Sequence, residues 1–183
     1  MLVVVAGLPL GILAGVASGR VLGQVIVTLT NAVLAIPALI MALVVITIMG
    51  GSMWGVIIAV SVAQIAPFAA VIRASVLAAQ SEKYVEAAYG LGATRRHVLT
   101  HHIALAIRPT IVSYGGVMFA YALLNSAALT FLGLGGEPGV PDWGVILAEG
   151  RAAFRVAPWI AFAPGMAITL TVWAMNHIVD EIA

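Results

Sequence analysis

The sequence predicts an all-α integral membrane protein with about five membrane-spanning helices. Apolar residues make up 63% of the 183 positions and charged residues only 8%, whereas a soluble domain carries about 25% charged residues. With so few charges the chain cannot cover a surface that faces water, so lipid is the expected solvent for much of it. The first 72 residues contain a single charged side chain, that of Arg20.

The apolar segments have the length that a bilayer requires. A spanning helix needs about 20 mostly apolar residues, because the hydrocarbon core is roughly 30 Å thick and each residue rises about 1.5 Å. We expect spans at about residues 2–17, 21–49, 53–79, 103–132 and 157–178, within one transmembrane domain that covers residues 1–183. The first is short and punctuated by glycine. Pro37 breaks the second in the middle, and Pro67 lies within the third.

Two hydrophilic loops separate these spans, at residues 80–102 and 133–156. Lys and Arg near span ends favour the cytoplasmic side of a membrane. Five spans put six of these residues on the side of the first loop and two on the other side: Arg20, Arg73, Lys83, Arg95, Arg96 and Arg108 against Arg151 and Arg155. The 80–102 loop is therefore predicted to be cytoplasmic and the 133–156 loop external.

The cytoplasmic loop contains the pattern of a short helix. Ser81 is a good N-cap, and Gly90 and Gly92 can end the helix because glycine adopts left-handed conformations without a Cβ penalty. Ala87 and Ala88 leave a surface that another protein can approach closely. From the residues alone, two interpretations stay open: a rigid lever that faces a partner protein, or an ordinary interfacial helix that joins two spans.

The motif in this loop resembles a known family. Glu86-Ala87-Ala88, followed after three residues by Gly92, is similar to the EAA loop of binding-protein-dependent ABC importer permeases. Other segments resemble the dipeptide/oligopeptide/nickel group of that family, at residues 8–15, 34–37 and 163–168. The most distinctive resemblance, at residues 130–135, 141–144 and 147–151, is to the external loop of the C-type subunit.

This resemblance implies an ABC importer permease fold and a set of site residues. Tyr84, Glu86, Ala87, Ala88 and Gly92 would form the coupling helix that docks on an ATP-hydrolysing subunit. The external loop, with Gly133, Gly135, Trp143 and Glu149, would serve as a docking or lid element. The family's first span and the loop after it have no counterpart in this chain, which we therefore expect to lack them.

The resemblance also implies partners and a location. The partners are two ATP-binding subunits, a second related permease subunit that completes a heterodimer, an extracytoplasmic substrate-binding protein and the lipid bilayer, with no nucleic acid. The location is the bacterial or archaeal inner membrane, and di- or oligopeptides are the expected substrates. ATP and Mg²⁺ would be used by the partner subunits, and no cofactor is expected on this chain.

The residues themselves argue against other chemistry. The sequence contains no Gly-x-x-x-x-Gly-Lys-Ser/Thr phosphate loop, so ATP must be hydrolysed by a separate chain and no enzyme activity is expected. His97 and His101 have an i,i+4 spacing that suits metal ligation, with His102 beside them. Arg95 and Arg96 lie next to these histidines and disfavour a divalent cation. Contact with lipid headgroups or a partner is therefore favoured over a metal site.

Polar residues within the spans are the remaining candidates for the pathway. Such residues more often form hydrogen bonds between helices than line a conduit. For Gln64 and Asn125 we nevertheless hypothesise that they border the translocation pathway. An ion-coupled secondary carrier is the main rival function, yet such carriers usually use membrane-embedded acids, and no predicted span has an acid in its interior. A non-transporting structural membrane subunit is the third alternative.

Overall fold

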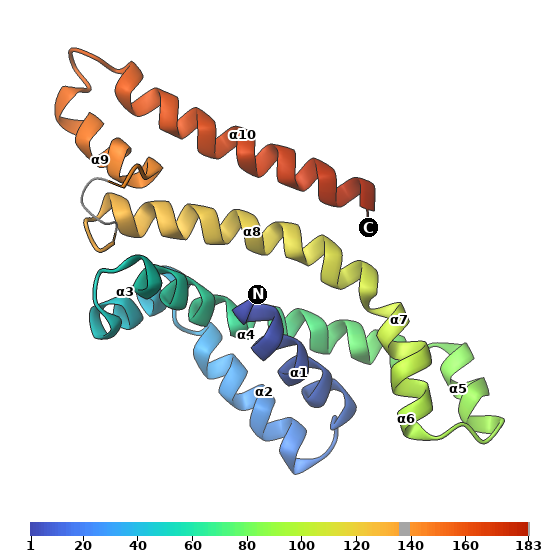
Figure 1. Ribbon diagram of the computed structural model, residues 1–183. Coiled ribbons are helices and arrows are strands. Elements are labelled where there is room, and N and C mark those ends of the chain that lie inside the picture. The colour runs from blue at the N-terminus through green and yellow to red at the C-terminus, as the bar shows by residue number, and fades with distance from the viewer. Residues whose placement is uncertain (136–139, 183) are drawn as a thin grey trace. The chain divides into compact units, whose positions relative to one another are not determined.

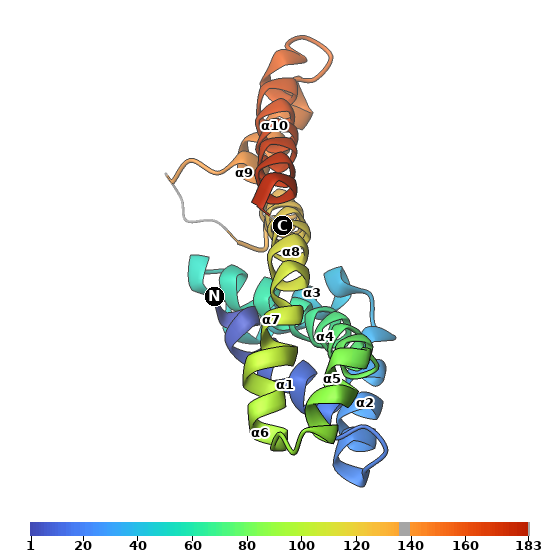
Figure 2. The same cartoon turned by 90° about the vertical axis from the view of Figure 1, so that its right-hand side faces the viewer.

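The computed structural model describes residues 1–135 and 140–182, and these residues form helices and connecting turns without any strand (Figures 1 and 2). The helices in chain order are α1 (Leu2–Val16), α2 (Val21–Leu34), α3 (Ala38–Met49), α4 (Met53–Gln80), α5 (Lys83–Gly90), α6 (Arg95–Val98), the π-helix η1 (Leu99–Ile103), α7 (Ala104–Ala106), α8 (Arg108–Phe131), α9 (Trp143–Ala153) and α10 (Trp159–Ile182).

Among the described residues, three helices are long and apolar enough to cross a membrane: α4, α8 and α10. The pair α2 and α3 passes the same test when taken together as one broken span. The helix α1 has 15 residues, which corresponds to about 22 Å at 1.5 Å per residue and is short for a bilayer. Three to four of the five expected spans thus meet this criterion, and a span at α1 stays a prediction.

Two of the long helices differ from the expected spans, α8 at its start and α10 at its end, which lies at Ile182 where the sequence predicts 178. The span expected from residue 103 begins as α8 only at Arg108, because residues 99–106 form a π-turn and a short helical segment before it. The external loop is not irregular throughout, since it contains the 11-residue helix α9. The break expected at Pro37 is present between α2 and α3, where proline disfavours helical backbone at the preceding residue.

The described chain divides into two compact units. Unit 1 comprises residues 1–35 and 65–115, and unit 2 comprises residues 36–64 and 116–182. Both α4 and α8 contribute residues to each unit, so the division does not separate consecutive domains along the sequence.

Close packing of α1 on α4 forms the core of unit 1. Gly7, Gly11 and Gly15 recur every fourth residue on one face of α1, and all three are buried. A Cβ built on Gly11 would lie 2.7 Å from the carbonyl oxygen of Ala69 and 2.7 Å from the Cβ of Ile72. Small residues at this spacing let two helix backbones approach closely in a membrane.

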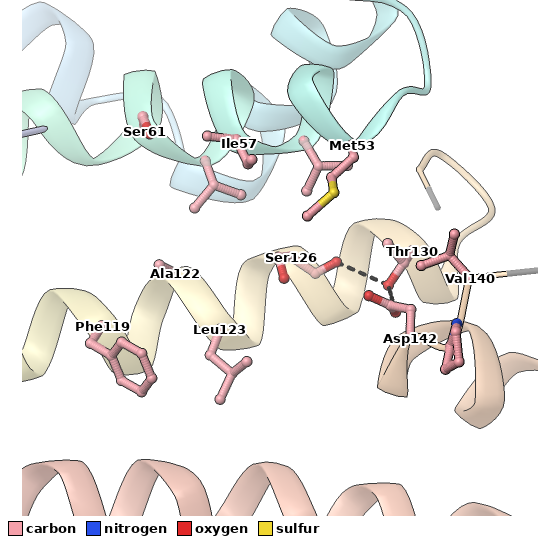
Figure 3. Close-up of a pocket in the computed structure, with 13 residues that line it drawn as sticks. Met53, Ile57, Ser61, Phe119, Ala122, Leu123, Ser126, Thr130, Val140 and Asp142 are labelled. Atoms are coloured by element: carbon pink, nitrogen blue, oxygen red, sulfur yellow. Dashed lines mark hydrogen bonds between the residues drawn. The ribbon is translucent and has the colours of Figure 1, made fainter. Parts of the chain in front are cut away.

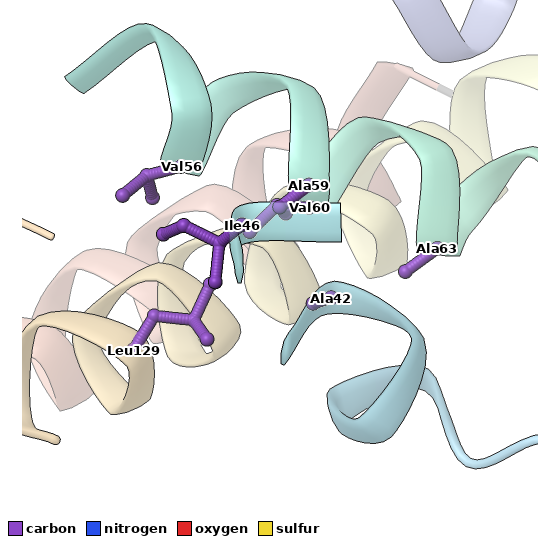
Figure 4. Packing of buried hydrophobic residues seen from close by; sticks show 7 residues of the cluster. All are labelled: Ala42, Ile46, Val56, Ala59, Val60, Ala63 and Leu129. Carbon is purple, nitrogen blue, oxygen red and sulfur yellow. The ribbon is translucent and has the colours of Figure 1, made fainter. Parts of the chain in front are cut away.

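The core of unit 2 is an apolar cluster from three helices (Figure 4). Its buried members are Ala42 and Ile46 of α3, Val56, Ala59, Val60 and Ala63 of α4, and Leu129 of α8. Small residues also bring other helices of this unit together. Gly150 of α9 faces the backbone of Ala161 in α10, and Gly116 of α8 faces the side chain of Val179.

We expect the substitution Gly11→Ala to destabilise the protein by about 1–3 kcal/mol, because the added methyl group overlaps the backbone and a branched side chain of α4. Gly165→Ala is the matched control, since its Cβ would meet no atom within 4 Å and alanine is the better helix former. Thermal unfolding in detergent should show a lower Tm for the first variant and an unchanged or higher Tm for the second. Equal shifts would contradict this packing of α1.

Candidate functional site

The predicted coupling loop folds into two short helices, α5 and α6, that lie side by side in unit 1 (Figures 1 and 2). Val85 of α5 and Val98 of α6 are almost fully buried, with exposed fractions of 1% and 0%. These two side chains attach the loop to the apolar interior. The other faces of α5 are therefore left for contact with another molecule.

The end of α5 is fixed by a Schellman motif. The N–H of Ala93 donates to the carbonyl of Ala88 and the N–H of Gly92 donates to that of Tyr89, both at 3.0 Å. Gly92 has φ +85°, the left-handed conformation that this motif requires at its C′ position. Of the two glycines considered, Gly92 is thus the one that ends the helix, and Gly90 is the last residue of α5.

The start of α5 differs from the sequence prediction. Glu82, not Ser81, is the N-cap residue, and its side chain makes no capping hydrogen bond. The Ser81 hydroxyl instead donates to the carbonyl of Ala78 at 2.7 Å. Because α4 continues through Gln80, Ser81 forms its side-chain hydrogen bond with one of the carbonyls at the C-terminal end of α4, which lack a partner within the helix.

The predicted coupling residues form an exposed surface on α5. Tyr84 is 45% exposed, Glu86 and Ala87 are exposed, and Ala88 is half-buried. Among the described residues, no cation pairs with Glu86. Leu91, which the sequence reasoning did not select, is 90% exposed immediately after α5. The surface thus combines small, apolar and acidic groups, a composition suited to a protein partner.

A π-turn gathers the three loop histidines. The helix η1 covers residues 99–103, so His102, at i+5, joins His101, at i+4, beside His97. The rings of His97 and His101 stack at 4.3 Å between centroids, and those of His97 and His102 lie 5.8 Å apart. No group of acidic, His or Cys side chains in the described part of the chain is arranged to hold a metal ion.

The two predicted pathway residues lie within helices of unit 2. Gln64 is only 5% exposed, and its Nε2 atom has no hydrogen-bond partner among the described residues. Asn125 is half-buried and its Nδ2 donates to the carbonyl of Tyr121 in its own helix at 2.8 Å. Their place beside a conduit stays a prediction.

The external loop is held to α8 through one carboxylate. Asp142 caps α9, its Oδ1 accepting from the N–H groups of Gly144 at 2.8 Å and Val145 at 3.1 Å. The same oxygen accepts from the Thr130 hydroxyl at 2.7 Å. A Cβ on Gly144 would collide with Thr130 and the Ala127 backbone, so α9 begins in close contact with the end of α8.

The four external-loop residues selected from the sequence occupy different positions. Gly133 has φ +75° and ends α8 in the left-handed region. Gly135 lies against the side chain of Val56. Trp143 is the first residue of α9 and is 38% exposed, and Glu149 is exposed on the same helix. The latter two side chains are therefore available to a partner.

A pocket of about 460 Å³ lies within unit 2 (Figure 3). Its walls come from the first part of α4, the second part of α8 and the residues before α9: Met53, Val56, Ile57, Val60, Ser61, Phe119, Ala122, Leu123, Ser126, Thr130, Val140, Pro141 and Asp142. Neither Gln64 nor Asn125 lines it, although their helix neighbours Ser61 and Ser126 do. Sequence reasoning missed these serines because hydropathy does not show which face of a helix borders a pocket.

A family model described as "Binding-protein-dependent transport system inner membrane component" matches residues 7–183. The chain belongs to this family. The description agrees with the long apolar helices α4, α8 and α10, and the chain is a multi-pass membrane protein of the permease type. The exposed α5 with its Glu86-Ala87-Ala88 sequence lies inside the matched range.

Curated relatives include the glutathione transport system permease proteins GsiD. The chain is 34% identical to that of Pectobacterium atrosepticum over 174 residues, covering 95% of this chain and 58% of the relative. It is 33% identical to that of Escherichia coli O157:H7 over 157 residues, covering 86% of this chain and 52% of the relative. The chain thus spans a little over half the length of these relatives.

The fold is also that of a solved transporter. A chain of the inward-facing MetNI methionine ABC transporter superimposes with a TM-score of 0.80 at 17% identity. The match covers 99% of this chain and 86% of that one. At this level of identity the similarity establishes the ABC importer permease fold.

We expect Gly92→Val to loosen the end of α5. A Cβ at this position meets no atom within 4 Å, so the cost is backbone strain from φ +85°, of about 1–3 kcal/mol. Hydrogen exchange of the amides of Gly92 and Ala93 should accelerate about tenfold or more, since 1.4 kcal/mol is a factor of ten. Gly90→Ala is the matched control, because Gly90 is helical and open, and it should leave exchange unchanged or slower. Equal acceleration in both variants would contradict the assignment of Gly92.

Proposed function

We propose that this chain is the membrane-spanning permease subunit of an ATP-driven, binding-protein-dependent importer of di- or oligopeptides. Family membership over residues 7–183 supports the class of transporter. The names of the relatives, which describe transport of glutathione, a tripeptide-sized solute, support peptides as the substrate class. The observation that carries the proposal is the exposed, rigidly ended helix α5 with its family motif.

In this proposal α5 transmits force between the membrane helices and an ATPase subunit. A lever of this kind must hold its shape when it is pushed. The Schellman motif at Gly92 fixes one end of α5, and the buried Val85 fixes the helix to unit 1. Ala87 and Ala88 permit close approach of the partner, while Glu86 and Leu91 provide a charge and an apolar side chain for recognition.

The remaining subunits follow from what this chain does not contain. Its sequence has no phosphate-binding loop, so two separate ATP-binding subunits would bind ATP and Mg²⁺ and hydrolyse the nucleotide. The chain carries a single loop of the coupling type, so a second related permease would supply the other. An extracytoplasmic binding protein would deliver substrate to the external loop, where Trp143 and Glu149 of α9 are exposed. The complex would lie in the bacterial or archaeal inner membrane.

The distribution of acidic residues favours ATP over an ion gradient as the energy source. Ion-coupled carriers usually place acids or broken-helix ion sites at membrane depth. The acids described in this chain lie in and just before α5, in and just before α9, and at the last residues of α10. Asp142, which contacts Thr130 of α8, already accepts three hydrogen bonds.

We expect Glu86→Lys and Ala88→Trp each to reduce co-purification of the ATPase subunits by at least tenfold when the chain is co-expressed with its partner permease and ATPases. Glu86→Lys reverses an exposed charge, and Ala88→Trp inserts a large ring where close approach is needed. Asp180→Lys makes a comparable charge change at the exposed end of α10 and should leave retention unchanged.

Three results would contradict the proposal. Wild-type retention in both loop variants would exclude α5 as the docking element. Transport that collapses with the proton or sodium gradient and persists after ATP depletion would favour an ion-coupled carrier. Failure of the wild-type chain to retain any ATPase, in a well-folded preparation, would favour a structural membrane subunit.

A further inference from the structure

We propose that the pocket of unit 2 is a solute-contact site, which holds an apolar side chain and binds an ammonium or amine group at Asp142 (Figure 3). This inference rests on the proposed function and identifies residues of this chain that would discriminate among solutes. A volume of about 460 Å³ falls within the roughly 300–1,000 Å³ of small-molecule sites, which combine apolar walls with a few polar groups.

The polar end of the pocket has an acceptor that no described residue uses. All three hydrogen bonds to Asp142 go to its Oδ1 atom, and its Oδ2 accepts none within the described ranges. No cation there forms an ion pair with this carboxylate. An ionised carboxylate can accept about four hydrogen bonds through its two oxygens. Asp142 can therefore bind a donor from a solute while it still caps α9.

The charge of this group determines the kind of solute. The single proton of the Thr130 hydroxyl already has three acceptors, Asp142 Oδ1 at 2.7 Å and the carbonyls of Ser126 and Ala127 at 3.1 and 3.2 Å. The polar end therefore presents acceptors and negative charge. A solute carboxylate placed there would be repelled, whereas an ammonium group would gain a charge-assisted hydrogen bond. The hydroxyls of Ser61 and Ser126 form no hydrogen bonds with described residues and can pair with amide groups of the same solute.

The rest of the pocket suits an apolar side chain. Met53, Val56, Ile57 and Val60 of α4 lie on one side, and Phe119 and Leu123 of α8 lie on another. From Met53 to Ser61 the helix rises by about 12 Å at 1.5 Å per residue, so the lining extends over about two helical turns. A short peptide with a free amino terminus and an apolar side chain matches both the length and the polarity.

A lipid acyl chain is the competing occupant, and the polar lining disfavours it. A hydrocarbon tail would fill the apolar walls and leave the free oxygen of Asp142 and the two serine hydroxyls without partners. The amine-bearing solute satisfies the same groups. Discrimination between a free and a blocked amine therefore separates the two occupants by experiment.

The test uses the full chain in lipid nanodiscs and a dipeptide that carries a diazirine-bearing leucine, with a free amino terminus or with an N-acetyl group. Illumination links the diazirine to nearby side chains, and mass spectrometry locates them. We expect labelling of the stretch 119–130 or 53–61, about tenfold stronger for the free amine than for the acetylated form, because a charge-assisted hydrogen bond exceeds a neutral one by about that factor.

Asp142→Asn should remove this preference and make the two dipeptides equivalent. The variant is expected to fold, since an asparagine oxygen also caps a helix and accepts from the Thr130 hydroxyl. Asp180→Asn is the matched control, the same change at an exposed position outside the pocket, and it should keep the tenfold preference. Leu123→Trp, which fills the pocket and leaves Asp142 in place, should reduce labelling by both dipeptides.

Three results would overturn the inference: equal labelling by the two dipeptides in the wild-type chain, an undiminished preference in Asp142→Asn, or labelling by a diazirine-bearing phospholipid that neither dipeptide displaces. The last result would identify a lipid site. ATPase retention through α5, measured on the same chain with its partner subunits, separates this failure from that of the proposed function. Retention without selective labelling would reject only the pocket, and loss of both would reject the proposed coupling role of α5 as well.

Discussion

The hydrocarbon core of the bilayer offers no hydrogen bonds to the backbone, and this constraint governs the whole chain. Each membrane segment must satisfy its own N–H and C=O groups, which makes it a helix. Among the described residues after Met1, non-helical backbone is confined to residue 107 and to short stretches at residues 17–20, 35–37, 50–52, 81–82, 91–94, 132–135, 140–142 and 154–158. The stretch 91–94 ends α5, and the stretch 140–142 precedes α9, which Asp142 caps. The features with functional chemistry therefore lie where helices end.

Lipid also removes the hydrophobic force that holds helices together in water, so close packing must replace it. In unit 1 the buried Gly7, Gly11 and Gly15 bring α1 against α4. In unit 2 glycines at positions 116, 144 and 150 bring α8, α9 and α10 into contact with each other. At most of these glycines an added Cβ would lie less than 3.0 Å from an atom of the neighbouring helix, so a larger residue would push the two helices apart. A chain with 19 glycines is thus consistent with tight, specific helix association.

Local patterns predicted the fold class and the presence of a short helix in the 80–102 loop, because both depend on residues close in sequence. Hydropathy located the long helices, and the break at Pro37 follows from proline's restriction of its neighbour. The prediction of Ser81 as the N-cap of α5 was wrong. The helix α4 continues to Gln80, and the Ser81 hydroxyl donates to a carbonyl at the end of α4. The pair of Thr130 and Asp142 could not be foreseen, since a contact across 12 residues depends on how α9 folds back. Ser61 and Ser126 escaped notice because hydropathy does not show which face of a helix borders a pocket.

The proposed coupling helix α5 and the pocket share no residue and belong to different units. Each is stabilised by its own local interactions: α5 by the Schellman motif and Val85, and the polar end of the pocket by the cap of α9. Substitutions at positions that share no partner usually have additive effects on stability. Energy coupling and solute discrimination should therefore be separable by mutation, with variants of α5 changing ATPase retention and variants of Asp142 changing which solute is held. If both proposals hold, the lining of the pocket can change while the docking surface on α5 is kept, so that one permease fold can serve importers of different solutes.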